Sequence, residues 1–93
     1  MKTVIIQIGN SDDKLTQAQW ALFVRYTDNA IRQRCNRVYF FSTSPNTDAW
    51  QNAAWIIDIY DNASYALRVA LKELRELYSQ DSVAWTEGKT SFI

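Results

Sequence analysis

The chain has 93 residues, the length of one domain, and its hydrophobic fraction of 47% with only two glycines and one proline excludes a disordered or repeat protein. Ten basic and ten acidic residues cancel, so the composition does not favour nucleic acid or an anionic membrane as a partner. The sequence contains no histidine, which excludes histidine-dependent nucleophiles, histidine general bases and the common zinc and iron sites. We therefore expect a single domain over residues 1–93.

Two features of the composition indicate a reducing compartment. Cys35 is the only cysteine, so an intramolecular disulfide is impossible. The opening segment, residues 1–7, is too short and too polar for a secretory signal, and no apolar run approaches the ~20 residues that span a bilayer. We expect a cytoplasmic protein. Cys35 lies in an arginine-rich stretch, which would lower the pKa of its thiol.

The first half of the chain predicts a strand, a helix and a strand. Residues 3–8 alternate between two apolar faces, which is typical of a central strand. Thr16 and Gln19 have the spacing of a capping box at the start of a helix. An apolar stripe then recurs at steps of three and four residues, formed by Trp20, Phe23, Val24, Thr27, Ala30 and Ile31. Residues 38–41 predict the second strand.

The second half predicts a long loop, a strand, a helix and a strand. Residues 42–52 begin with a polar run that indicates a connection, and residues 54–59 alternate as a strand. Asp61 and Asn62 are expected to cap the second helix. Its apolar stripe consists of Leu67, Ala70, Leu71, Leu74, Leu77 and Tyr78. Residues 82–86 predict the last strand.

The order of these elements predicts an α+β fold of the ferredoxin-like β-α-β-β-α-β type. In this sandwich an antiparallel sheet with strand order 4-1-3-2 carries both helices on one face. The opposite face would present Ile5, with Tyr39 or Phe40. Because an apolar open face on a monomer is an interface or a liability, we expect a homodimer formed through it. The segment 89–93 is expected to pack on the sheet or to add an edge strand.

This topology gathers three loops at one end of the sheet. They are residues 9–14, 42–52 and 79–82, which we call the three-loop end. Turn and cap chemistry explains much of their polarity, and a loop tryptophan serves either as a lid on the core or as an interface anchor. The candidate residues for binding a ligand or partner are Asn10, Ser11, Asp12, Asp13, Trp50, Gln80, Asp81 and Ser82.

The carboxylates of the same loops offer an alternative. Oxygen ligands of this kind bind magnesium, and a bound water then becomes the nucleophile of a phosphodiesterase or nuclease. Their spacing matches no known ligand motif, so the leading hypothesis includes no cofactor, no metal and no catalytic residue. The carboxylates concerned are Asp12, Asp13, Asp48 and Asp81.

A basic side of the molecule suggests a third class, binding of single-stranded RNA. Its arginines flank an aromatic strand at 39–41, but the sequence pattern of RNA-recognition strands is missing. Arginines at a helix end also stabilise the helix dipole, and we favour that explanation. The arginines are Arg25, Arg32, Arg34 and Arg37.

Three segments resemble small proteins from actinobacteria and their phages for which no activity is known. They read IGNSDDKLTQ at 8–17, AWQNAAW at 49–55 and QDSVAW at 80–85. The resemblance implies a phage or mobile-element origin, a location in the host cytoplasm, and a host-modulating or anti-defence role. A weaker likeness is to the small CRISPR-associated ferredoxin-like nucleases, which share the fold order and an acidic residue after the first strand. Here Asp12 and Asp13 lie several residues beyond that strand.

The sequence as a whole favours a binding protein without enzymatic activity. The expected partner is a host protein or a small nucleotide ligand held at the three-loop end. Neither a membrane nor nucleic acid is expected as a partner. The alternative is the magnesium-dependent phosphodiesterase or nuclease.

Overall fold

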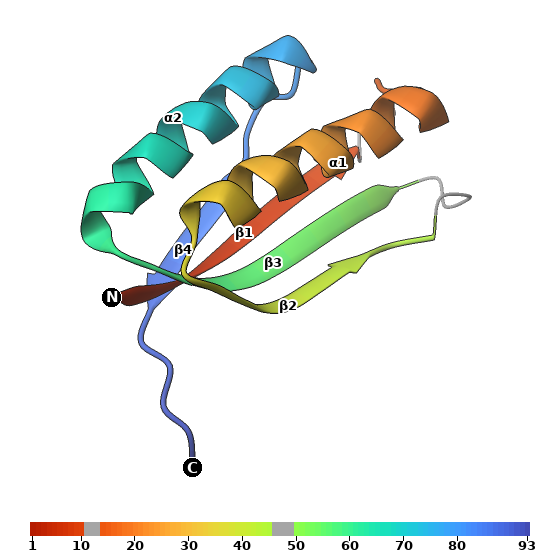
Figure 1. The fold of residues 1–93 in the computed structure, drawn as a ribbon. Helices are drawn as coiled ribbons and strands as arrows, with labels where there is room; N and C mark the ends of the chain where they lie inside the picture. Colours follow the sequence, from red (N-terminus) through yellow and green to blue (C-terminus); the bar gives the residue numbers. More distant parts are fainter. Residues whose placement is uncertain (11–13, 46–49) are drawn as a thin grey trace.

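A computed structural model of the chain describes residues 1–10, 14–45 and 50–93. The sheet contains β1 (Lys2–Asn10), β2 (Arg37–Thr43), β3 (Gln51–Ile59) and β4 (Ala84–Gly88), and the helices are α1 (Gln17–Arg34) and α2 (Asp61–Leu77). The strands lie in the order β2-β3-β1-β4, and every neighbouring pair is antiparallel. Both helices cover one face (Figure 1). The predicted ferredoxin-like fold is therefore confirmed.

The core lies between the helices and the two central strands. In β1 and β3 alternate residues are buried, and the register pairs Val4 with Ile57 and Ile6 with Trp55 on the helix side. Trp20 and Phe23 of α1 pack against this layer. Each large apolar side chain removed from water contributes roughly 1.5–3 kcal/mol, so a small domain depends on every such position.

The loop between β2 and β3 is shorter than the sequence predicts. Its strands extend to Thr43 and begin again at Gln51, because backbone pairing continues beyond the apolar residues. Ser44 and Asn52 pair at the base of this loop. Ser44 N–H donates to Asn52 O at 2.8 Å, and Asn52 N–H donates to Ser44 Oγ at 2.8 Å. β4 begins at Ala84, two residues later than predicted.

The two helices begin differently. At α1 the predicted capping box is confirmed: Gln19 N–H donates to Thr16 Oγ1 at 3.1 Å, and Thr16 N–H donates to Gln19 Oε1 at 2.9 Å. The predicted cap of α2 is wrong. Its N-cap is Tyr60, which provides no side-chain hydrogen bond, and Asp61 is already the first helical residue. An aromatic side chain without a capping bond thus occupies the position that Ser, Thr, Asp or Asn normally fills.

The last turn of α2 ends in a Schellman motif. Ser79 adopts a left-handed conformation with φ of 54°, and its N–H donates to Glu76 O at 3.1 Å. Gln80 N–H donates to Arg75 O at 2.9 Å, the second bond of the motif. Leu77, which the periodicity assigns to the core, is 71% exposed because the chain turns away here.

The sheet face opposite the helices is open. Ile5, Ile56 and Phe40 share this face by register, and Phe40 is 51% exposed. The C-terminal tail lies along one end of the face as a non-strand segment. Thr90 Oγ1 lies 2.5 Å from Thr3 Oγ1, and the Phe92 ring meets Tyr39 edge-on, so the tail contacts the sheet through two side chains while residues 89–93 stay exposed and add no strand.

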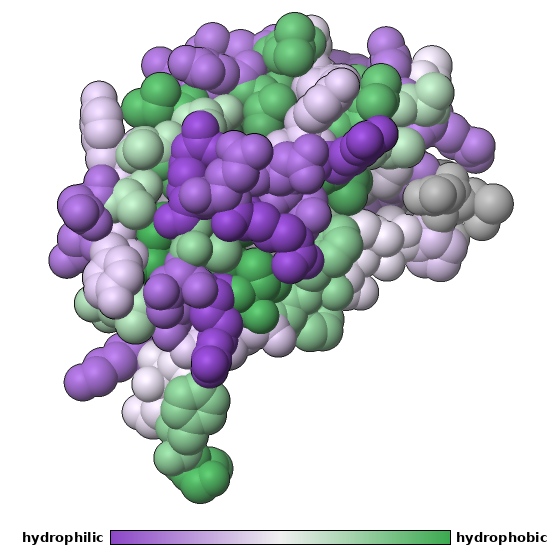
Figure 2. Space-filling model, in the orientation of Figure 1, coloured by the Kyte–Doolittle hydropathy of each residue, from purple (hydrophilic) through white to green (hydrophobic). Residues whose placement is uncertain are grey.

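The surface of the helix side is mainly polar. Figure 2 shows hydrophilic side chains with apolar patches between them, and the apolar end of the chain projecting from the body. Among the described residues, neither helix combines the length and apolarity that crossing a membrane requires.

Candidate functional site

The three connections predicted to converge do leave the sheet at the same end. β1 ends at Asn10, which is paired with Gln51 at the start of β3, and β4 begins at Ala84, paired with Gln7 of β1. The C-terminal end of β1, the β2–β3 loop and the segment before β4 therefore lie at one end of the sheet (Figure 1). Four of the predicted residues lie outside the described part of the chain: Ser11, Asp12, Asp13 and Asp48.

Asn10 is a fully buried amide with a structural role at this end. Its Nδ2 donates to Leu15 O and to Gln51 Oε1, both at 3.0 Å. Its Oδ1 accepts from Leu15 N–H at 3.0 Å. The side chain thus holds both ends of the connection from β1 to α1 and ties it to β3. It supports the three-loop end from within and does not reach solvent.

Gln80 is also buried and lies just after the C-terminus of α2. Its Nε2 donates to Tyr78 O at 3.1 Å, and its own carbonyl accepts from Arg75 Nη1 at 3.1 Å. Like Asn10, it holds a loop in place rather than facing a ligand.

Three of the described candidates are exposed: Asp81, Ser82 and Trp50. Lys14 Nζ lies 3.7 Å from Asp81 Oδ1, which brings the first and third loops together. Because the Asp81 side chain is largely exposed and the Lys14 side chain is about half exposed, this ion pair contributes little stability. The indole of Trp50 is 73% exposed, one residue before the anchored Gln51.

A hollow of about 320 Å³ lies at the same end, where α1 begins and α2 ends. Lys14, Leu15 and Gln19 form one wall, and Leu77 and Tyr78 form the other. Burial raises the pKa of the Tyr78 hydroxyl, whose ring stacks on Phe23 with centroids 5.0 Å apart. Sequence reasoning missed this hollow because Leu77, which lines it, falls on the same periodic stripe as the core leucines of α2.

The described residues give the metal hypothesis no support. No group of three carboxylate or thiolate ligands lies together among residues 1–10, 14–45 and 50–93. Asp81, the described member of the proposed set, pairs with Lys14. The other members lie in the segments that are not described.

Three of the four arginines of the basic side have contacts within the fold. Arg32 Nε lies 2.8 Å from Asp28 Oδ1, and Arg34 Nη1 donates to Ala30 O at 3.0 Å. The Arg37 guanidinium lies 5.7 Å from the centroid of Tyr39.

The expected lowering of the Cys35 pKa is wrong: burial raises the pKa of the thiol more than nearby Arg32 lowers it.

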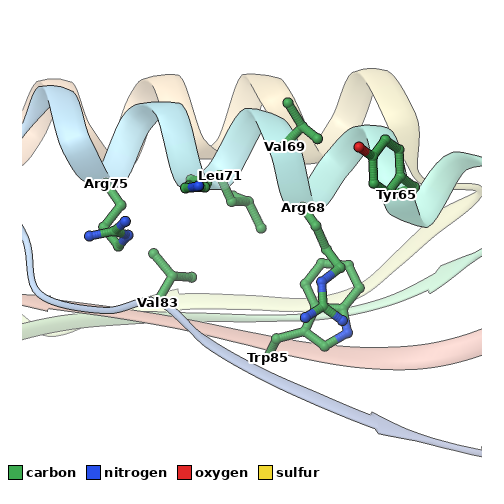
Figure 3. A pocket seen from close by; sticks show the side chains of 8 residues that line it. Tyr65, Arg68, Val69, Leu71, Arg75, Val83 and Trp85 are labelled. Carbon is green, nitrogen blue, oxygen red and sulfur yellow. The ribbon is translucent and has the colours of Figure 1, made fainter.

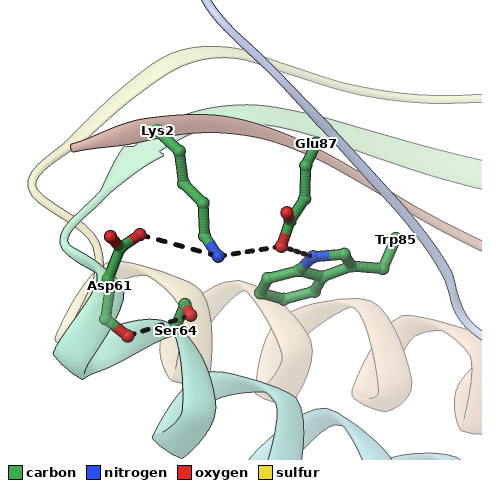
Figure 4. A network of polar contacts seen from close by, with 5 residues as sticks. All are labelled: Lys2, Asp61, Ser64, Trp85 and Glu87. Carbon is green, nitrogen blue, oxygen red and sulfur yellow. Dashed lines mark hydrogen bonds and ion pairs between the residues drawn. The ribbon is translucent and has the colours of Figure 1, made fainter.

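A polar network fastens the opposite end of the sheet (Figure 4). Lys2 Nζ lies 2.8 Å from Glu87 Oε1 and 3.7 Å from Asp61 Oδ1, and the Trp85 indole N–H donates to Glu87 at 3.0 Å. The hydrogen bond from Lys2 is the main cause that lowers the pKa of Glu87, and the same bond raises the pKa of Lys2. These side chains join β1, β4 and α2.

A second concave surface lies between α2 and β4 (Figure 3). It is a groove of about 400 Å³ that includes Arg68, Lys72 and Arg75 from the helix and Val83 and Trp85 from the segment that ends in β4. The sequence assigns the three cations to an ordinary solvated helix face. Only the position of β4 beside α2 turns that face into one wall of a groove.

The chain matches no protein-family model and no curated protein. The argument for function therefore depends on the geometry of the molecule itself.

Proposed function

We propose that the protein is a binding protein without enzymatic activity, and that it engages its partner through the three-loop end. The contact residues are Trp50, Asp81 and Ser82, while Asn10 and Gln80 hold the loops from inside. Ser11, Asp12 and Asp13 complete the proposed surface.

The observation that supports this proposal best is the exposed indole of Trp50. Its backbone neighbour Gln51 is buried and bonded to Asn10, so the exposed ring stands on an anchored part of the sheet. Tryptophan is enriched among the residues that dominate interface energies, and a preorganised anchor loses little entropy on binding. Because Trp50 is 73% exposed, it does not serve as packing in the core.

The resemblance of three segments to small proteins of actinobacteria and their phages supports a host protein as the partner. In that case the protein modulates its host or blocks a defence system from within the host cytoplasm. A small nucleotide ligand is the other partner that the three-loop end suits, because the exposed Ser82 hydroxyl and the Lys14 ammonium can provide polar contacts and the Trp50 ring can stack on a base.

The test compares the wild-type protein with Trp50→Ala and with Tyr26→Ala, an exposed aromatic side chain on α1 that serves as the matched control. Each protein is tagged and used to capture partners from an actinobacterial lysate, and native mass spectrometry of the wild type detects a bound small ligand. We expect a partner, or a bound mass of a few hundred daltons, that Trp50→Ala loses and Tyr26→Ala keeps, with the same Tm in all three proteins.

Two outcomes would contradict the proposal. Identical capture by all three proteins, with no bound small molecule, would place binding elsewhere. Hydrolysis of nucleic acid or a cyclic nucleotide that EDTA abolishes and Asp12→Asn impairs would establish the magnesium-dependent enzyme instead.

We also propose a homodimer formed through the open sheet face. Phe40, Ile5 and Ile56 share that face, and within the described residues no helix covers it. Phe40→Glu should convert the dimer to a monomer in analytical ultracentrifugation, whereas Leu22→Glu on the helix side should not. A monomeric wild type at micromolar concentration would contradict the dimer.

A further inference from the structure

The α2–β4 groove is a surface that the proposed function does not use. Figure 3 shows Arg68, Leu71 and Arg75 pointing from α2 toward the segment that carries Val83 and Trp85. The groove of about 400 Å³ therefore has a cationic wall from the helix and an apolar floor from the sheet edge.

The charge of this groove has one sign. Its lining contains three cationic side chains and no carboxylate. The neighbouring acids are already engaged: Glu76 lies 3.5 Å from Arg75, and Glu87 is bound by Lys2 at 2.8 Å and by the Trp85 indole at 3.0 Å. Within the described residues, Lys72 has no ion pair. A concave surface lined by one sign of charge concentrates ligands of the opposite sign, so the groove selects acidic groups.

The groove runs beside a free sheet edge. β4 is an outer strand whose described partner is β1 alone, and the register between them contains no shift. The other outer strand, β2, has an irregularity between Val38 and Phe40, a device that blocks further pairing. The unpaired N–H and C=O groups of β4 thus offer a regular edge to another strand.

The spacing of the cations matches that of an added strand. Arg68 and Lys72 are one helical turn apart, about 6 Å along α2. On one face of an extended strand the side chains repeat every second residue, about 6.8 Å apart. A strand added beside β4 with acidic residues at alternate positions would therefore bring successive carboxylates to successive cations.

We propose that the α2–β4 groove binds an acidic segment of another protein in the extended conformation, added as a strand to the free edge of β4. Alternate carboxylates pair with Arg68 and Lys72, and the backbone pairs with β4. This site is separate from Trp50, so either binding activity can be lost while the other remains.

Two other occupants fit less well. A second copy joined through β4 would bring the cationic wall of each copy toward that of the other, and like charges that face each other destabilise an interface. A nucleotide base would stack on Trp85, but the Arg68 guanidinium already lies over that ring, 5.2 Å from its centroid.

The experiment uses fluorescence polarisation with a labelled peptide of Glu-Thr repeats. Two control peptides replace glutamate by lysine, or threonine by proline, so that either the charge or the ability to form a strand is lost. Backbone amide shifts in NMR spectra of the full chain locate the contact. We expect the Glu-Thr peptide to bind, to shift the amides of residues 83–88, and to lose about tenfold or more of its affinity in Lys72→Glu and in Arg68→Glu.

Arg25→Glu on the exposed face of α1 is the matched control and should leave the affinity unchanged. Equal binding of the proline peptide would overturn strand addition. If Arg25→Glu lost as much peptide affinity as Arg68→Glu and Lys72→Glu, the net charge of the protein rather than the groove would explain the binding. Binding of oligo-dT at the same amides, without peptide binding, would identify a nucleic-acid site instead. No binding of the Glu-Thr peptide at about 1 mM would also overturn the proposal.

Discussion

Two fully buried polar side chains of this molecule are in opposite situations. Asn10 uses its amide in bonds to Leu15 and Gln51. Thr27 in α1 is also completely buried, but among the described residues its Oγ1 has no hydrogen-bond partner. A bonded buried group stabilises its surroundings, whereas an unbonded one loses its hydration without compensation. The two residues should therefore respond to apolar substitution with opposite sign.

Asn10→Ala should lower the free energy of unfolding by about 1–3 kcal/mol, because it leaves the backbone of Leu15 unpaired. Urea denaturation followed by tryptophan fluorescence measures the change. Ser82→Ala at the exposed part of the same end is the control and should stay within about 0.5 kcal/mol of the wild type. An equally small effect for Asn10→Ala would mean that the connection to α1 does not depend on this amide.

Thr27→Val should raise the free energy of unfolding by about 1 kcal/mol, because the variant keeps the shape and removes a buried hydroxyl without a partner. Thr27→Ser is the matched control: it keeps the hydroxyl, loses a methyl group and should be destabilised by about 1 kcal/mol. A loss of stability in Thr27→Val, measured in the same denaturation experiment, would indicate that the hydroxyl does have a partner in solution.

The helices differ in how their first turns are satisfied. Thr16 and Gln19 supply two reciprocal bonds at α1, whereas Tyr60 supplies none at α2. Tyr60 nevertheless has the extended backbone of an N-cap, with φ of −72° and ψ of 147°. A polar side chain at this position would need no change of the backbone in order to cap the helix.

Tyr60→Ser should therefore raise the free energy of unfolding by about 0.5–1 kcal/mol, and Thr16→Ala should lower it by a similar amount. Thermal unfolding followed by circular dichroism measures both shifts in Tm. If both variants shifted Tm in the same direction, end capping would not explain the difference between the two helices.

On the scale of the whole molecule, ionic contacts join elements that are distant in sequence. Lys2 and Glu87 lie at opposite ends of the chain and meet across β1 and β4, with Asp61 of α2 beside them. The lowered pKa of Glu87 and the raised pKa of Lys2 mean that both charged forms are favoured in the folded state. Their contribution is therefore present between the two titrations and is lost on either side.

At acid pH the change in folding stability is set by Glu87. Because its folded pKa lies below the unfolded value of about 4.3, the stability it provides is present above that value and is lost as the pH falls through the folded pKa. The difference in Tm between the wild type and Glu87→Gln should therefore shrink in a pH titration below about 4.3. For Glu73→Gln, on the exposed face of α2, the difference should stay small throughout. A constant difference for Glu87→Gln would show that its charge does not contribute.

The order of elements could be predicted because it depends on local patterns. The capping box of Thr16 and the stripes of the two helices are encoded in residues three or four apart, and the alternation of β1 and β3 is encoded in neighbours. These patterns, together with the handedness of crossover connections, limit a β-α-β-β-α-β chain to the observed strand order.

The candidate site was predictable only as a region. Convergence of the three loops follows from topology, but burial does not: Asn10 and Gln80 have the same polar character as Ser82, yet they lie inside and bond to the backbone. Whether a polar side chain faces a ligand or the core depends on neighbours that the sequence does not place beside it.

The sequence by itself determined the α+β fold, the antiparallel sheet and the end at which the loops meet, because periodicity and turn chemistry act over a few residues. Tertiary structure alone decided that Tyr60 rather than Asp61 precedes α2, that Leu77 is exposed, and that Arg68 and Lys72 line a groove. The exposure of Leu77 follows from the turn at Ser79, whereas the groove depends on contacts between α2 and β4, which are distant in the chain and come together only when the sheet forms.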